Sequence, residues 1–247
     1  MTDAALFISD LHLAPERPLP VDLFHRFLEE VAPRASALYV LGDFLEAWVG
    51  DDTLSQPFHH GLATALKGLS DRGVALFFLP GNRDFLVGAA FAEAAGLTLL
   101  ADPARIDLFG TSTLLTHGDQ FCTDDAEYQG FRRQVRDPAW QQQFLQQPLQ
   151  QRLALAKALR ESSEHAKAGK RPEIMDVNSV AIRDMLKSPI GRTPPIRRII
   201  HGHTHRPARH EHLIEGQQVE RWVLPDWYEQ GGYLACDADG CRLSDFV

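Results

Sequence analysis

The chain is poor in cysteine, in long apolar runs and in basic charge. Its three cysteines, Cys122, Cys236 and Cys241, are odd in number and lack metal-site spacing, which suits a reducing cytoplasm. No apolar stretch approaches the length of a membrane span, and the first apolar run breaks at Asp10 with no basic region before it, which argues against a secretory signal. The net charge of −8 argues against a general nucleic-acid binder, because such proteins are usually basic.

The apolar pattern of the first half predicts strands that alternate with helices. Short, bounded runs rich in β-branched and aromatic residues predict buried strands. Between these runs, helical spacing predicts helices over 21–31, 56–72 and 86–95, of which the first closes at Pro33 and the last at Gly96. The length of 247 residues fits one large domain, or a core with an insertion.

The alternation then stops, which predicts an insertion. Over about 124–187 the pattern shows helix-like pieces broken by prolines, and strand patterns resume after Pro195. We therefore predict a core formed by 1–121 and 195–247, interrupted by a helical cap formed by 122–194. The insertion is mildly basic on an acidic chain, which suits either a solvated helix face or contact with an anionic ligand or lipid surface.

Five short polar motifs each follow directly on a strand-like run. They are Asp10-Leu11-His12, Gly42-Asp43, Gly81-Asn82-Arg83-Asp84, Thr116-His117-Gly118-Asp119 and Gly202-His203-Thr204-His205. The runs before them are 6–8, 38–41, 76–79, 113–115 and 199–200. An α/β sheet of the parallel type carries its chemistry just past the carboxyl ends of its strands. We therefore expect these motifs to converge at one sheet edge.

The residue types in the motifs indicate a two-metal centre. A mixed set of Asp, Asn and His suits borderline transition metals. Asp-x-His can direct two side chains at one ion, His-x-His can give one ligand to each of two ions, and Asp43 can bridge them. Two ions about 3.5–4 Å apart polarise a phosphoryl group and generate a hydroxide nucleophile at neutral pH. Each motif alone is common by chance, but five in this order together favour metal binding.

The motifs resemble those of the calcineurin-like metallophosphoesterases. The pattern of that family is D-x-H, G-D-x-x-(D/E), G-N-H-(D/E), a lone H and G-H-x-H, and Glu46 completes the second element here. The resemblance implies an α/β sandwich of two mixed β-sheets flanked by helices, and two Mn²⁺ or other divalent transition metals. The first metal would be held by Asp10, His12, Asp43 and His205, and the second by Asp43, Asn82, His117 and His203.

One motif departs from the family pattern, because Arg83 stands where the family has His. That His is usually assigned as an acid that assists the leaving group. Arg cannot do this, since its pKa lies above about 12, but it is a permanent bidentate clamp for phosphate oxygens. A pyrophosphate has a leaving group already stable as an anion, so it needs no such acid. The alternative is a surface salt bridge between Arg83 and Asp84.

The same G-N-R-D marks a branch of the family that the chain resembles over nearly its whole length, the UDP-2,3-diacylglucosamine diphosphatases of lipid A biosynthesis. The matching stretches include 41–52 and 79–85. The resemblance implies hydrolysis of UDP-2,3-diacylglucosamine at the α-phosphorus by a metal-bound hydroxide, giving UMP and 2,3-diacylglucosamine 1-phosphate. It implies catalytic roles for Asp43, Arg83 and His117.

We expect peripheral attachment to the cytoplasmic face of the inner membrane and no obligate protein partner. We expect no nucleic-acid partner, because the chain is acidic. Two alternatives stay open. One is a metallophosphoesterase that acts on another nucleotide or phosphodiester. The other is a catalytically silent, metal-stabilised binding protein for a phospholipid or a protein.

The resemblance also suggests substrate contacts, most of them in the cap. The family pattern Ser-x3-Asn-x2-Lys aligns with Ser163, Lys167 and Lys170, so Lys replaces Asn in the middle. For each cap residue the alternative is an exposed polar side chain. The full set of suggested contacts is Asn82, Arg83, Asp125, Tyr128, Arg160, Ser163, Lys167, Lys170 and His203.

The apolar residues of the cap allow two interpretations. They either pack on the core or line a groove that holds two acyl chains. A groove would lie beside a basic rim of Arg132, Arg133, Arg136 and Lys170, and an amphipathic lid of this kind could rest on an anionic bilayer. The apolar positions are Phe131, Val135, Trp140, Phe144, Leu145, Leu149, Leu153, Ala156 and Leu159.

Three further histidines lie close to the last motif. His201 ends the strand-like run before the motif, and we expect it to be a buried hydrogen-bonding residue and not a third ligand. His210 and His212 follow in a strand-like segment and are expected to face solvent.

Overall fold

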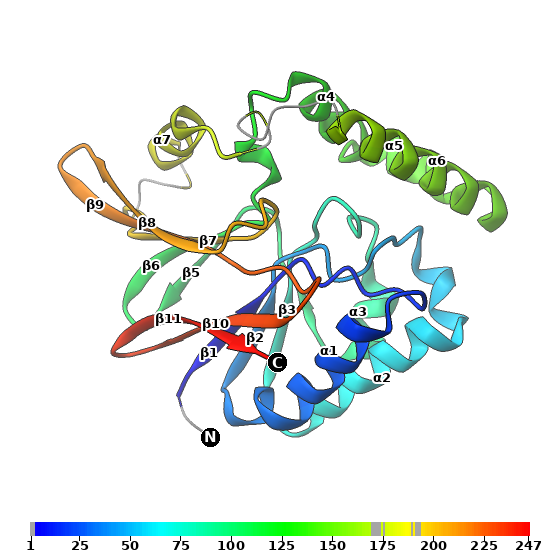
Figure 1. Ribbon diagram of the computed structural model, residues 1–247, viewed down its shortest axis with the longest axis horizontal. Coiled ribbons are helices and arrows are strands. Elements are labelled where there is room, and N and C mark those ends of the chain that lie inside the picture. Colours follow the sequence, from blue (N-terminus) through cyan, green and yellow to red (C-terminus); the bar gives the residue numbers. More distant parts are fainter. Residues whose placement is uncertain (1–2, 169–173, 175, 189, 191–193) are drawn as a thin grey trace.

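Two β-sheets, three helices beside them and a helical insertion make up the protein (Figure 1). The computed structural model describes residues 3–168, 174, 176–188, 190 and 194–247, with 162–168 by backbone only.

The first sheet has six strands, of which four are parallel neighbours. They are β1 (Ala5–Ile8), β2 (Ala37–Val40), β3 (Ala75–Phe78), β4 (Thr98–Leu99), β10 (Gly231–Asp237) and β11 (Gly240–Phe246). Their spatial order is β11-β10-β1-β2-β3-β4, and β10 runs antiparallel to both of its neighbours. The register of β1 to β3 stacks the rings of Phe7, Tyr39 and Phe77 across the sheet, with centroids 4.8 and 4.6 Å apart.

The second sheet has five strands and mixes both directions. They are β5 (Ala104–Leu108), β6 (Thr111–Leu115), β7 (Arg198–His201), β8 (Ala208–Ile214) and β9 (Gln217–Val223), in the spatial order β5-β6-β7-β9-β8. β7 is parallel to β6 and β9, whereas β5–β6 and β8–β9 are antiparallel pairs. An apolar layer drawn from both sheets lies between them, and it includes Phe7, Leu41, Leu115, Ile200, Trp222 and Leu234.

Three helices cover the other face of the first sheet: α1 (Pro18–Glu30), α2 (Pro57–Asp71) and α3 (Ala89–Ala95). α1 turns Phe24, Phe27 and Leu28 into the core at helical spacing, and α2 does the same with Leu62 and Leu66. Proline at the first turn suits both helices, since it lacks the amide hydrogen that would find no partner there. These helices confirm the predicted ones over 21–31 and 56–72.

The insertion contains α4 (Ala126–Val135), α5 (Pro138–Leu145), α6 (Leu149–Ala168) and α7 (Ser179–Lys187). Three of them begin at a side-chain cap, because Asp125, Asp137 and Asn178 accept the backbone N–H of Tyr128, Trp140 and Val180. In Figure 1, α4 to α6 lie at the end of the molecule opposite the N-terminus, and α7 lies above β8 and β9.

The insertion is fastened to the core by buried contacts. Arg152 of α6, 3% exposed, donates to the carbonyl of Val49 and pairs with Asp52. Phe144 joins the core cluster beneath α1 to α3. Ile182 of α7 packs on the second sheet with other apolar side chains. Some of the apolar cap residues therefore pack on the core, as the first of the two interpretations predicts.

The architecture confirms the predicted α/β sandwich of two mixed sheets flanked by helices. The strands β4 and β5 were not predicted. Cys236 and Cys241 face each other across β10 and β11 and form a disulfide, which differs from the expectation drawn from the cysteine count. Cys122 is buried and takes no part in a disulfide. Within the described residues, no helix combines the length and apolarity that crossing a membrane requires.

Candidate metal centre

The predicted metal ligands come together where the carboxyl ends of strands from both sheets meet. Three of the strands belong to the first sheet and two to the second. Asp10 and His12 follow β1, Asp43 follows β2, Asn82 follows β3, His117 follows β6, and His203 and His205 follow β7. The convergence expected from the motifs is therefore present.

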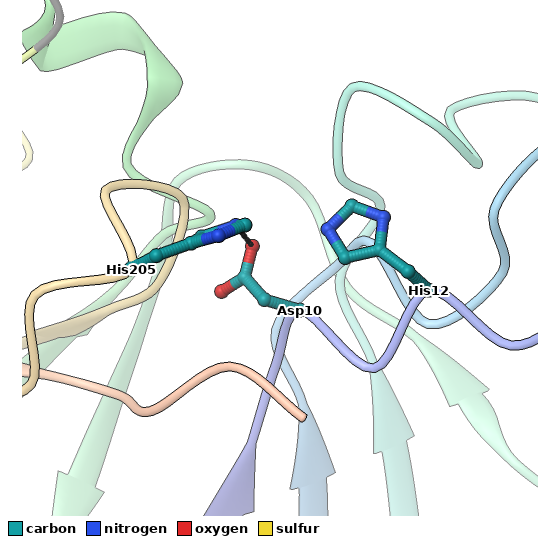
Figure 2. A group of neighbouring side chains, drawn as sticks. All are labelled: Asp10, His12 and His205. Carbon is teal, nitrogen blue, oxygen red and sulfur yellow. Dashed lines mark ion pairs between the residues drawn. The ribbon is translucent and has the colours of Figure 1, made fainter. Parts of the chain in front are cut away.

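Asp10, His12 and His205 form the first cluster, with ligand atoms that all lie within 4.8 Å of one another. Figure 2 shows Asp10 between the two imidazole rings. Oδ1 of Asp10 lies 3.3 Å from Nε2 of His205, while Oδ2 accepts the Ser9 hydroxyl at 2.6 Å and the His203 backbone N–H at 2.9 Å. Two protein donors thus occupy one oxygen and leave the other directed into the cluster.

Asp43, His117 and His203 form the second cluster, and Asn82 adds an amide oxygen. Nε2 of His117 lies 2.9 Å from Oδ1 of Asn82, 3.2 Å from Nδ1 of His203 and 3.6 Å from Oδ1 of Asp43. The other nitrogen of His117, Nδ1, is 2.9 Å from the carbonyl of Leu41 and donates to it. This bond selects the tautomer that leaves Nε2 available as a ligand.

Asp43 lies between the two clusters. Its Oδ1 faces His117 and also accepts the backbone N–H of Arg83 at 2.8 Å. Its Oδ2 is 3.7 Å from Nε2 of His12, which belongs to the first cluster. One carboxylate therefore touches both clusters, as a bridging ligand must.

Unsatisfied buried atoms show that divalent cations fit this centre. In the described part of the chain, Oδ1 of Asp10 and both ring nitrogens of His12 are buried without a partner of hydrogen-bond geometry. Such atoms are rare in folded proteins unless an ion or water satisfies them. Burial penalises the charged form of His117, yet Asp43, Asp10 and Asp119 raise its pKa to about 9. The centre thus favours positive charge, and its imidazole, carboxylate and amide donors suit Mn, Fe, Co or Zn.

The backbone at the ligands is held in an unfavourable conformation. Seven described non-glycine residues have positive φ, and five of them are predicted ligands. Left-handed backbone in such residues costs on the order of 1–3 kcal/mol each and clusters at functional sites. The five ligands and their φ angles are Asp10 (56°), His12 (49°), Asp43 (49°), His203 (68°) and His205 (54°).

A buried carboxylate fixes the two loops that carry Asp43 and Asn82. Asp84 is fully buried and accepts the backbone N–H groups of Gly81 at 2.7 Å and Phe44 at 2.8 Å, with two longer bonds from Asp43 and Leu45 at 3.3 Å. Burial and the charge of Asp43 raise the pKa of Asp84 to about 6. Gly42 and Gly81 let the loops touch, because a Cβ on either would collide with the backbone of the other loop.

The centre opens into a cavity of about 440 Å³ that has a polar and an apolar end. His12, Asp43, Asn82, Arg83, His203 and His205 line the polar end. The apolar walls come from the loops of the core and from the cap, and they include Trp48, Phe85, Phe131, Trp140, Phe144, Ala156 and Leu159. Five of the nine apolar cap positions named from the sequence therefore face this cavity, while Val135 is buried and Leu145 and Leu153 are exposed.

Three of the suggested cap contacts also line the cavity. Asp125 caps α4, Tyr128 stacks on His203 with its hydroxyl donating to Asp119 at 2.9 Å, and Nε of Arg160 lies 3.2 Å from Glu46. Ser163 and Lys167 lie in the part of α6 described by backbone only. Lys170 lies outside the described residues.

The predicted basic rim is wrong for two of its arginines. Nε of Arg132 lies 2.9 Å from Asp119, and Arg136 donates to the carbonyls of Pro80 and Gly81 at 3.2 and 3.0 Å. Both side chains are about one-fifth exposed and turn toward buried carboxylates of the core. They anchor α4 to the loops of the centre, and Arg133 alone among the described rim residues stays exposed.

Glu46 links the first cluster to the cap. Its carboxylate lies 3.5 Å from Nδ1 of His12, 3.3 Å from Arg17 and 3.2 Å from Arg160 of α6. The sequence showed Glu46 only as the last position of G-D-x-x-E. Tyr228 gave no signal at all, yet its ring stacks on His12 at 5.4 Å between centroids and lies under the Arg17 guanidinium.

Three histidines close to the last motif, His201, His210 and His212, are not among the predicted metal ligands. His201 is fully buried, and its Nδ1 donates to the carbonyl of Gly202 at 2.8 Å, which confirms the hydrogen-bonding role. His212 does not simply face solvent, because its Nε2 accepts from Arg221 at 3.2 Å. His210 is half-buried beside the same arginine.

Comparison with known proteins identifies the family of the chain. The calcineurin-like phosphoesterase family matches residues 5–207. Proteins named UDP-2,3-diacylglucosamine hydrolase are similar over almost the whole chain. The one from Aromatoleum aromaticum is 49% identical, covering 96% of this chain and 94% of its own. Those from Stenotrophomonas maltophilia and Xanthomonas campestris are 52% and 50% identical, covering 96% and 98% of both chains. The chain therefore belongs to the calcineurin-like phosphoesterase family and is a relative of the proteins named UDP-2,3-diacylglucosamine hydrolase.

Proposed function

We propose that the protein hydrolyses the pyrophosphate bond of UDP-2,3-diacylglucosamine at the α-phosphorus, giving UMP and 2,3-diacylglucosamine 1-phosphate. The observation that carries this proposal is the single cavity that joins two metal-type ligand clusters to an apolar wall. A substrate with a pyrophosphate and acyl chains has the same two ends. The names of the relatives, at about half identity over nearly the full chain, support it.

Two Mn²⁺ ions would each be held by a separate set of ligands that share Asp43. Asp10, His12 and His205 would hold the first, and His117, His203 and Asn82 the second, with Asp43 shared. When bound, such ions polarise the phosphoryl group and supply an activated water. The bond from Nδ1 of His117 to Leu41 and the bonds of Ser9 and the His203 amide to Asp10 hold the ligand atoms in place.

Arg83 supplies a permanent positive charge in the cavity beside Asp43. Its guanidinium would hold phosphate oxygens and stabilise the charge that develops on the departing phosphate monoester. Because the leaving group is already stable as an anion, no proton donor is required at this position.

We also propose that 122–194 act as a cap on a core formed by 1–121 and 195–247. All described residues of this range are helical or irregular. Phe131, Trp140, Phe144 and Leu159 would contact the acyl chains, while Asp125, Tyr128, Arg160 and the Ser163, Lys167 and Lys170 group would contact the sugar, uridine or phosphates.

Substrate discrimination tests the proposed function. With Mn²⁺ supplied, we expect UDP-2,3-diacylglucosamine to be hydrolysed with a kcat/KM at least about 100-fold above that of UDP-N-acetylglucosamine, because acyl burial adds binding energy per buried CH₂. UMP release measures both reactions, and a nitrophenyl phosphodiester is the third substrate. Equal turnover of acylated and unacylated substrates would reject the lipid-specific function and favour another metallophosphoesterase activity. The same assay with Mg²⁺, Co²⁺ and Zn²⁺ tests the metal.

Replacing the shared carboxylate should remove turnover. Asp43→Ala is expected to lower kcat by more than about 100-fold, since it deletes a ligand common to both clusters. Metal content by atomic absorption should fall in parallel, while circular dichroism should stay native. Asp107→Ala, on an exposed strand position, is the matched control. Retained activity in Asp43→Ala would refute the bridging role.

Arg83→Ala should lower kcat more than it raises KM. A charge that is needed mainly in the transition state is worth about 10²–10³-fold in kcat. Arg83→Lys should recover part of the loss, because it keeps the charge without the planar fork. A rise in KM with kcat unchanged would instead assign Arg83 to ground-state binding.

We propose peripheral attachment to the cytoplasmic face of the inner membrane through the cap. Leu145 and Leu153 are 43% and 38% exposed there, and Lys157, one helical turn after Leu153 on α6, is also exposed. Leu145→Gln/Leu153→Gln should bind anionic phospholipid vesicles at least about tenfold more weakly in sedimentation, given the apolar area lost. Leu213→Gln, on the exposed edge strand β8, is the control. Unchanged binding of the double variant would contradict attachment by this surface.

A further inference from the structure

A second, smaller cavity lies behind the loop that carries His203 and His205. It has a volume of about 300 Å³. We call it the Arg221 cavity and define it by Asp176, Thr204, Arg206, Ala208, His210 and Arg221. Thr204 and Arg206 also border the larger cavity, so the two cavities share one wall. The floor is the face of β8 and β9 that lies beneath α7 in Figure 1.

Arg221 brings a buried charge to this cavity. The residue is only 7% exposed, and a guanidinium stays protonated in proteins. Its Nε donates to Nε2 of His212 at 3.2 Å, and its Nη1 donates to Nε2 of His201 at 3.0 Å. Within the described residues, Arg221 forms no ion pair with a carboxylate. A buried charge without a counter-charge is costly and rare.

The imidazoles that accept from Arg221 supply no negative charge. Nδ1 of His201 donates to the carbonyl of Gly202, so its Nε2 is the unprotonated nitrogen of a neutral ring. Burial and the neighbouring Arg221 lower the pKa of His212 and of His210. All three rings are therefore neutral at physiological pH.

The remaining charges of the cavity do not balance Arg221 either. Asp176 is the carboxylate that lines it, and this carboxylate forms an ion pair with Arg206. Among the described lining residues, two arginines and one aspartate leave a net positive charge. A guanidinium with N–H donors left over after two bonds is suited to a bidentate contact with an oxyanion.

We propose that the Arg221 cavity binds a phosphate-type oxyanion, either free phosphate or the phosphoryl group of a phosphate monoester. Arg221 would donate to it from below and Arg206 from the rim. The site is separate from the two metal clusters, but the anion would lie directly behind Thr204, between the two ligands of the His203-Thr204-His205 motif.

Binding stoichiometry tests this site in the metal-loaded full chain. Isothermal titration calorimetry with inorganic phosphate and, in a second arm, with UMP measures equivalents bound. Ala208→Glu places a carboxylate in the cavity, and Arg221→Gln removes the charge. Each is expected to bind one equivalent fewer than the wild type. Arg209→Gln, on the same hairpin but outside the cavity, should keep the wild-type number.

The variants also separate the possible outcomes. If Arg221→Gln fails to fold, Ala208→Glu decides, and its melting temperature in phosphate-free buffer should exceed that of Ala208→Gln, which has the same bulk without the charge. Loss of an equivalent with phosphate, UMP or both supports the site and tells free phosphate from a monoester. Equal stoichiometry in wild type and Ala208→Glu, or the same loss in Arg209→Gln, would overturn it.

Discussion

The carboxylate of Asp84 is the contact on which the centre depends. By accepting four backbone N–H groups it joins the loop after β2 to the loop after β3, which places Asp43 and Asn82 on the same side. Leaving one such buried donor unmatched costs about 1–3 kcal/mol, so the loops cannot separate cheaply. Joining the two loops also brings the carboxylates of Asp43 and Asp84 close together. Burial and the charge of Asp43 raise the pKa of Asp84 to about 6. Bound cations would offset that repulsion.

The backbone of five ligand residues is strained, and neighbouring loops hold it in place. Asp10, His12, Asp43, His203 and His205 all hold left-handed backbone that non-glycine residues avoid. Their hydrogen bonds to neighbouring loops, such as Asp10 N–H to Gly42 and His12 N–H to Asp43, keep them there. These bonds fix the positions of the ligand residues relative to one another.

The sequence predicted the parts of this structure that depend on local pattern. Strands β1, β2, β3, β6 and β7 follow from short apolar runs, and the rule for strand ends then places the ligands. β4 was missed because Thr98 and Leu99 are only two residues, and β5 because Arg105 and Asp107 interrupt its apolar positions. The basic rim failed for a different reason. Periodicity shows which face of a helix a residue occupies but not which residue it contacts. Arg132 contacts Asp102 and Asp119, and both lie outside α4.

Those partners change what the cap contributes to the centre. Arg136 holds the carbonyls before Asn82, Tyr128 covers His203, and Arg160 reaches His12 through Glu46. Each contact ties a cap helix to a ligand or to its loop, so a shift of the cap would disturb both clusters. Four cap arginines thus contact carboxylates of the core, namely Arg132, Arg136, Arg152 and Arg160. The other described basic residues of the cap are exposed, namely Arg133, Lys157, Arg183 and Lys187. Under the proposed function, the apolar wall would favour an acylated substrate, because the metal ligands and Arg83 would contact only its phosphate oxygens.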